Sequence, residues 1–154
     1  MLFRKTKVRR AITKIGLGAI LSDGMTRDAE ITGLALALTG FPFMSDITRD
    51  ECLKLINEAW KEIKRAAVEG RFVEEIARSC MLLKKGPDAE AVTAFSVALF
   101  VCLSDGELRG TEVGYIEMLT VNLSITRAVQ QTAIDDIRAL IERTRAAVEQ
   151  KKAD

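Results

Sequence analysis

Hydrophobic residues recur at steps of three and four along most of this chain, and no stretch alternates with the period of two expected of a strand. The pattern is clearest after Thr48, which forms a capping box with Glu51 at the start of a helix that Gly70 ends. The inward positions expected for this helix are Leu53, Ile56, Trp60, Ile63 and Ala67.

Further helices are expected over residues 7–21, 27–38, 72–83, 88–103 and 111–123, before a long final helix that Ser124 or Thr126 caps. The 88–103 segment is apolar nearly all round, which predicts the central, buried helix. The inward positions of the final helix should be Val129, Ala133, Ile137, Leu140, Ile141 and Val148. The chain of 154 residues is therefore expected to form an all-α, single-domain bundle of about seven helices, with a basic segment over residues 1–12 and a helical domain over residues 13–150.

A short acidic motif occurs twice, at points where an apolar helix is expected to stop. The two sequences are ILSDGMTRDAEI and CLSDGELRGTEV, and they pair Asp23 with Glu30 and Asp105 with Glu112 at the same spacing. The helix dipole favours a glutamate in a first turn but disfavours an aspartate at a helix end, by ~0.3–1 kcal/mol. One Asp-Gly copy is most simply a turn. Two copies indicate an internal helix–SDG–helix duplication in which the acids share a role.

If the two halves pack together, the four carboxylates converge and repel one another. They are tolerable if they are protonated, paired with Lys or Arg, or bridged by a hard cation. Oxygen ligands favour Ca²⁺, Mg²⁺ or Mn²⁺, and the spacing is not that of an EF-hand, because glycine directly follows the first aspartate. Arg27 and Arg109, at matching positions, offer the metal-free alternative. The predicted metal ligands are Asp23, Glu30, Asp105 and Glu112.

At these residues the chain resembles the TerB-like family, which is associated with tellurite resistance. That family is recognised by a helix ending in A-x-A-D-G followed by x5-E, in two copies around a helical middle; here the copies read AILSDGMTRDAE and VCLSDGELRGTE. The likeness spans about residues 13–145. The resemblance implies an all-α fold of two related halves, with an acidic metal-binding or interaction surface. It also implies a link to envelope and metal stress, often with membrane-associated partners.

Composition narrows the chemistry further. The chain has no histidine, which removes the commonest general base and the commonest transition-metal ligand. Cys52, Cys80 and Cys102 are widely spaced, and we expect buried free thiols in a reducing compartment. A metal-dependent hydrolase that uses the four carboxylates is an alternative, but the sequence offers no group to activate a nucleophile. We therefore expect a protein that is not an enzyme.

Six basic residues and no acid precede Asp23, although the net charge of the chain is +1. A solvated helix end accounts for this charge, and contact with anionic lipid is the functional alternative. The near-zero net charge argues against nucleic acid. The longest apolar stretch, 91–103, is shorter than the roughly 20 residues that span a bilayer. The residues expected at a lipid surface are Arg4, Lys5, Lys7, Arg9 and Arg10.

Together these features predict a non-enzymatic, stress-associated adaptor domain that binds a divalent cation or a protein partner through paired acidic turns. A metal-free structural interaction domain is the alternative. The expected location is cytoplasmic, with peripheral contact at the inner face of the membrane, because no secretory signal is visible in the sequence. The pattern does not indicate an oligomeric state.

Overall fold

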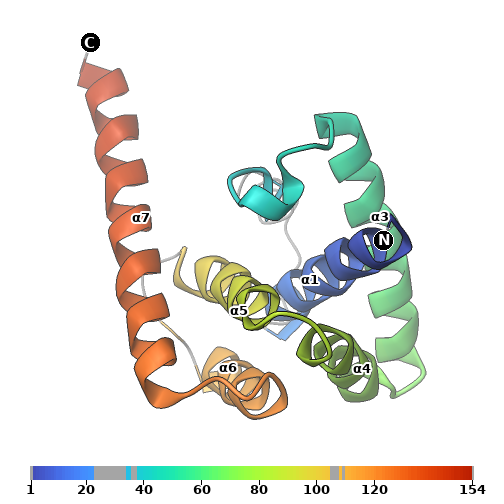
Figure 1. Cartoon of the computed structure of the whole chain (residues 1–154). Coiled ribbons are helices and arrows are strands. Elements are labelled where there is room, and N and C mark those ends of the chain that lie inside the picture. The colour runs from blue at the N-terminus through green and yellow to red at the C-terminus, as the bar shows by residue number, and fades with distance from the viewer. Residues whose placement is uncertain (1, 23–33, 36–37, 105–107, 109, 154) are drawn as a thin grey trace.

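The computed structural model describes residues 2–22, 34–35, 38–104, 108 and 110–153. These residues hold no strand, so the predicted all-α bundle is confirmed (Figure 1). The helix predicted over residues 27–38 lies mostly outside the described residues. The elements are α1 (Leu2–Ser22), the 3-10 turn η1 (Pro42–Met44), α3 (Arg49–Val68), α4 (Phe72–Lys84), α5 (Asp88–Leu103), α6 (Gly110–Asn122) and α7 (Arg127–Ala153).

The centre of the bundle is the pair α1 and α5. Figure 1 shows α3 and α4 on one side of this pair and α7 on the other, where α7 packs along α5. The α5 helix is buried nearly all round, as its apolar sequence predicts, and Phe95 is among its fully buried residues. Burial of such a side chain contributes about 1.5–3 kcal/mol to stability. The α1 helix supplies the aliphatic partners Ile12, Ile15, Leu17 and Ile20.

Local signals set several of the helix ends. The Thr48 hydroxyl oxygen accepts a hydrogen bond of 3.2 Å from the Glu51 amide, which confirms the predicted N-cap of α3. Gly70 follows this helix with a φ of 74°, which glycine adopts at little cost. Thr126 caps α7 rather than Ser124, because its hydroxyl oxygen accepts from the Val129 amide at 3.3 Å.

The first helix begins at Leu2, five residues earlier than predicted. Two ion pairs hold its first turns against the rest of the chain: Arg4 lies 3.1 Å from Glu90, and Lys5 lies 2.6 Å from Asp46. The boundary expected after residue 12 falls inside this continuous helix.

The inward face of α3 agrees with the prediction at Ile56 and Ile63, which are buried, and differs from it at the other positions. Leu53 is 37% exposed, and Trp60 lies at the edge of the core, where the Lys64 ammonium stands 5.4 Å from its ring centre. Apart from the two isoleucines, the inward positions hold small side chains, which let α1 and α4 approach α3 closely. The buried set is Cys52, Ile56, Ala59, Ile63 and Ala66.

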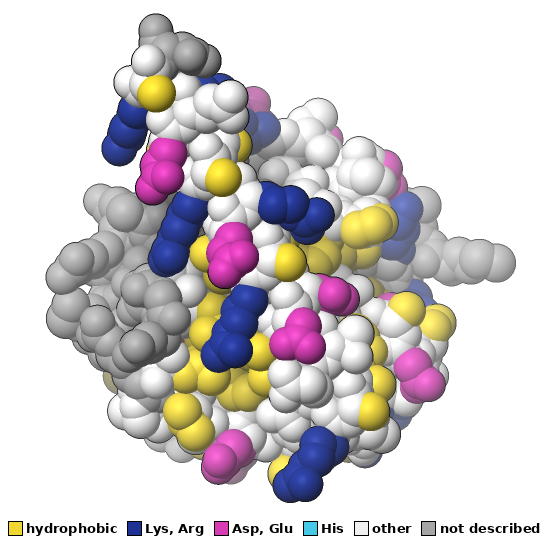
Figure 2. Space-filling model, turned by 90° about the vertical axis from the view of Figure 1, so that its left-hand side faces the viewer, with side chains coloured by type: hydrophobic (Ala, Val, Ile, Leu, Met, Phe, Trp, Pro, Cys, Tyr) yellow, Lys and Arg dark blue, Asp and Glu magenta, His cyan; other side chains and the backbone are white. Residues whose placement is uncertain are grey.

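The C-terminal half of α7 also departs from its prediction. Val148 was expected to face inward but is 48% exposed, and Ile141 is the last buried residue of this helix. Figure 1 gives the reason, because α7 extends past the end of α5 and none of the other described helices lies beside it there. In Figure 2, which views the molecule from the α7 side, this face carries Lys, Arg, Asp and Glu interspersed. Within the described residues, none of the helices has the length and apolar content needed to cross a bilayer.

The three cysteines are buried and free, as predicted. Burial raises the pKa of the Cys80 thiol to about 12 and also raises the pKa of Cys52. Because the thiolate is the reactive form, the folded protein should react negligibly with a disulfide reagent at pH 8. We expect three thiols to react once the protein is unfolded in urea, which an absorbance assay with Ellman's reagent measures. A fast-reacting thiol in the folded protein would contradict this assignment.

Candidate functional site

Of the four residues predicted to form the acidic site, the structure describes Glu112. Asp23, Glu30 and Asp105 lie outside the described residues; α1 ends at Ser22, directly before Asp23, and α5 ends at Leu103, two residues before Asp105. Glu112 lies in the first turn of α6, as predicted, and is 4% exposed. A buried carboxylate is costly unless charged or hydrogen-bonding groups compensate it. The burial of Glu112 therefore indicates a compensating environment at the start of α6.

The helices that lead into the two acidic segments run in the same direction. Arg4 of α1 pairs with Glu90 of α5. Further along both helices, Gly16 lies against Val97, since a Cβ atom on Gly16 would be 3.0 Å from the Val97 Cγ1 atom. The two contacts follow the same order along each helix, so α1 and α5 are oriented alike.

The contact between Gly16 and Val97 also limits how far apart these helices end. Ser22 is six residues beyond Gly16, and Ser104 is seven beyond Val97, which is about 9 and 10.5 Å along the helix axes. Packed helix axes lie about 8–10 Å apart. If the two helix axes cross at 90° or less, these lengths put the two helix ends within about 20 Å of each other.

The start of α6 belongs to the same end of the bundle. The Tyr115 hydroxyl donates a 2.6 Å hydrogen bond to the carbonyl of Ile15 and lies over Gly18 of α1. Burial holds the pKa of this hydroxyl well above its usual range, so it stays a donor. Glu112 is one helical turn before Tyr115. Glu112 therefore lies on the same face of α6 as Tyr115, the face that packs on α1.

The structure adds a basic residue that the sequence did not indicate. The Arg145 guanidinium of α7 donates a 3.4 Å hydrogen bond to the carbonyl of Ser104, the C-cap of α5. This places a cation directly beside the second SDG segment. Arg27 and Arg109, the residues expected to neutralise the acids, lie outside the described residues. Spacing could not identify Arg145, because 41 residues separate it from its partner.

A metal site elsewhere in the described part of the chain has no support. Over the described residues, no group of three or more Cys, Asp or Glu side chains is placed to hold a metal ion. Of the four predicted ligands, Glu112 is among these residues, and the other three lie outside the described residues.

The basic residues of α1 are largely engaged within the protein. Of the five residues expected at a lipid surface, Lys7 is exposed and makes no ion pair with a described acid. The other four form ion pairs: Arg4 with Glu90, Lys5 and Arg9 with Asp46, and Arg10 with Glu58 and Glu62. The helix start is therefore fixed on the bundle by its own charges.

Acid should weaken this attachment. Hydrogen bonds from Lys5 and Arg9 lower the pKa of Asp46 to about 2 from an ordinary value of 3.8. A depressed carboxyl pKa stabilises the fold above the ordinary value, and this contribution is lost as the pH falls toward the folded-state value. We expect the stability difference between the wild type and Asp46→Asn to shrink between about pH 4 and pH 2, as measured by urea unfolding. A difference that is constant with pH would contradict this.

Comparison of the chain with protein-family models, with curated proteins and with solved structures gives no match.

Proposed function

We propose that this chain is a non-enzymatic, TerB-like helical adaptor whose two SDG segments hold a divalent cation. The parallel orientation of α1 and α5 carries the proposal, because both helices end at the same end of the bundle and the acidic segments follow them in the sequence. Glu112 supports it further, because it is buried in the first turn of α6, on the face that Tyr115 packs against α1. The proposed ligands are Asp23, Glu30, Asp105 and Glu112.

The chemistry of these groups fits a hard cation. Carboxylate oxygens suit Ca²⁺, Mg²⁺ and Mn²⁺, and the absence of histidine from the sequence disfavours zinc and copper. A cation held between the two segments would link the N-terminal and C-terminal halves of the chain. Binding of the cation would then stabilise the packing of the two halves against each other. An adaptor whose structure depends on metal in this way can respond to the metal concentration.

Cation binding is tested by calorimetry and thermal melts of the chelator-treated protein with each of the three cations. A ligand at about 100 times its Kd that binds the folded state should raise the free energy of unfolding by about 2.7 kcal/mol. We expect Asp23→Asn/Asp105→Asn to abolish this increase. The matched control is Asp135→Asn/Asp136→Asn, which changes the charge equally at two exposed positions of α7. Loss of the effect in both variants, or no effect in the wild type, would contradict the proposal.

A second candidate follows from the position of Arg145. Its hydrogen bond to Ser104 brings a cation to the second acidic segment, as a metal-free interaction domain requires. In that case no cation alters the melting temperature, and Asp23→Asn/Asp105→Asn lowers the stability of the metal-free protein. Arg145→Gln should then lower it as well, whereas Arg143→Gln, an exposed neighbour on α7, should not.

A further inference from the structure

Charge is divided unequally between two parts of the chain. Residues 2–22 and 49–85, which form α1, α3 and α4, contain 15 Lys and Arg against 7 Asp and Glu. The rest of the chain contains 8 Lys and Arg against 15 Asp and Glu. The net charge of +1 is therefore the sum of +8 on the part that contains α1, α3 and α4 and −7 on the rest of the chain. In Figure 1 the positive part is the side of the molecule away from α7.

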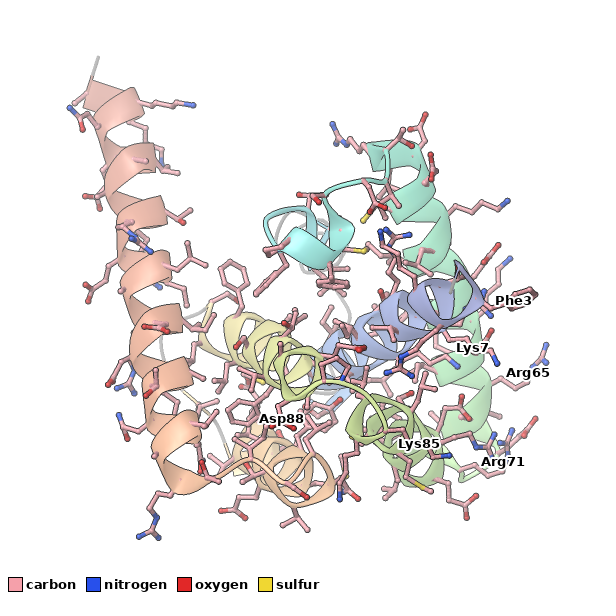
Figure 3. The ribbon with its side chains drawn as sticks, viewed as in Figure 1. Phe3, Lys7, Arg65, Arg71, Lys85 and Asp88 are labelled. Atoms are coloured by element: carbon pink, nitrogen blue, oxygen red, sulfur yellow. The ribbon has the colours of Figure 1, made fainter. Side chains whose placement is uncertain are left out.

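Several cations on this side are available to a partner. Lys7 of α1, Arg65 near the end of α3 and Lys85 after α4 are exposed and make no ion pair with a described acid. Figure 3 shows Lys7 and Arg65 at the edge of the molecule that α1 and α3 form, with Lys85 on the neighbouring end of α4. The contact between Arg4 and Gly86 brings this end of α4 to the start of α1. We call Lys7, Arg65 and Lys85 the cationic face.

Exposed apolar side chains accompany these charges. Phe3 is 83% exposed and lies one helical turn before Lys7, at the outer edge of the molecule in Figure 3. The α3 and α4 part adds further exposed apolar residues, namely Val68, Val73 and Met81. A single exposed apolar residue needs no explanation, but apolar side chains beside unpaired cations are the composition of surfaces that lie on membranes.

We propose that the cationic face, with Phe3, docks on an anionic lipid surface. Basic residues are attracted to anionic headgroups, and an aromatic side chain beside them can enter the headgroup region. Nucleic acid fits less well, because exposed aliphatic side chains add nothing to phosphate contacts and because successive bases stack on a series of aromatic rings, whereas the proposed surface includes a single aromatic ring, that of Phe3. This docking surface uses none of the residues of the acidic segments. It differs from the predicted lipid contact in that Arg4, Lys5, Arg9 and Arg10 pair with acids of this chain.

The test is co-sedimentation of the full chain with vesicles of phosphatidylcholine that contain phosphatidylserine, compared with vesicles of phosphatidylcholine without it. We expect binding to the anionic vesicles, weakened by added salt. Lys7→Gln/Arg65→Gln/Lys85→Gln should weaken binding by about fivefold for each charge, which is about 100-fold in all. Phe3→Ser should weaken it without changing the salt dependence.

The control is Arg127→Gln/Arg138→Gln/Lys151→Gln, which removes three exposed charges from α7 on the opposite side. It should bind like the wild type, and circular dichroism should show both triple variants folded. Equal loss in the two triple variants would overturn the proposal in favour of net charge without a docking face. Equal binding to both kinds of vesicle, or capture of an oligonucleotide in place of vesicles, would also overturn it. Binding of divalent cations by Lys7→Gln/Arg65→Gln/Lys85→Gln should be unchanged. Failure of the lipid proposal can therefore be distinguished from failure of the proposed cation binding.

Discussion

Replacement of Lys14 with methionine should lower the free energy of unfolding by about 3 kcal/mol, at the lower end of the range for a broken buried ion pair. Lys14 is 8% exposed, and its ammonium donates a 2.8 Å hydrogen bond to Glu75 and also pairs with Glu62. The methionine leaves the Glu75 carboxylate largely buried without this donor. Arg78, 3.8 Å from Glu75, compensates in part, which is why the lower end applies.

The effect of Lys14→Met should depend on pH. The hydrogen bond from Lys14 is the main cause that lowers the pKa of Glu75 below its ordinary value of 4.5. Stabilisation from a depressed carboxyl pKa is present above the ordinary value and is lost as the pH falls through the folded-state value. The stability difference between the wild type and Lys14→Met should therefore shrink below about pH 4.5.

Urea unfolding measures both effects, with the slope against urea as a check that the unfolded state is unchanged. The matched control is Lys7→Met, the same substitution at an exposed position of the same helix. It should change the free energy of unfolding by no more than about 0.5 kcal/mol. A similarly small effect at Lys14 would show that the ion pairs of this residue do not hold α1 against α3 and α4.

Replacement of Gly18 with valine should destabilise the protein by about 2–3 kcal/mol through overpacking. A Cβ atom at this position would lie 2.9 Å from the Ile76 Cδ1 atom and would overlap the Tyr115 hydroxyl oxygen. The glycine is what allows α6 to come close enough for Tyr115 to reach the carbonyl of Ile15. The larger residue should push α6 away from α1 and weaken that hydrogen bond.

A double-mutant cycle separates this cause from loss of glycine in general. Tyr115→Phe removes the overlapping oxygen, so the double variant Gly18→Val/Tyr115→Phe should cost less than the sum of the single changes. Gly114→Ala is the control, because its added Cβ would have no atom of the other described elements within 4 Å, and a helical alanine should raise stability by about 1 kcal/mol. Strict additivity in the cycle would contradict the packing explanation.

Local signals made much of the fold predictable from the sequence. Thr48 and Gly70 bound α3 through side-chain capping and a positive φ, both of which depend on residues close in sequence. The apolar character of the 88–103 segment likewise predicted the buried position of α5. These features needed no knowledge of what packs against the helix.

Features that depend on distant partners could not be read in the same way. Apolar spacing favoured the large Leu53 and Trp60 for the inward face of α3, whereas close approach of α1 and α4 selects the small Cys52 and Ala59. The basic start of α1 was expected to be solvated or bound to lipid, because Asp46, its partner, lies in a separate segment.

The sequence predicted the two acidic motifs, but it did not predict how the helices that lead into them are arranged in space. Repetition of the Asp and Glu spacing singled out Asp105 and Glu112 without any structure. The shared direction of α1 and α5 could not be deduced from spacing, because it follows from contacts such as that of Gly16 with Val97. The presence of Arg145 at the end of α5 depends in the same way on how α7 packs.

Spin labels on Ser22→Cys/Ser104→Cys would measure whether α1 and α5 deliver the two acidic segments to the same end of the bundle. The native cysteines are buried, so the labels should attach to the two introduced thiols. Pulsed electron paramagnetic resonance should give a main distance of about 20 Å, from the helix lengths beyond the crossing and the usual spacing of packed helices. A main distance beyond about 30 Å, the length of a 20-residue helix, would place the segments at opposite ends and contradict a shared acidic site.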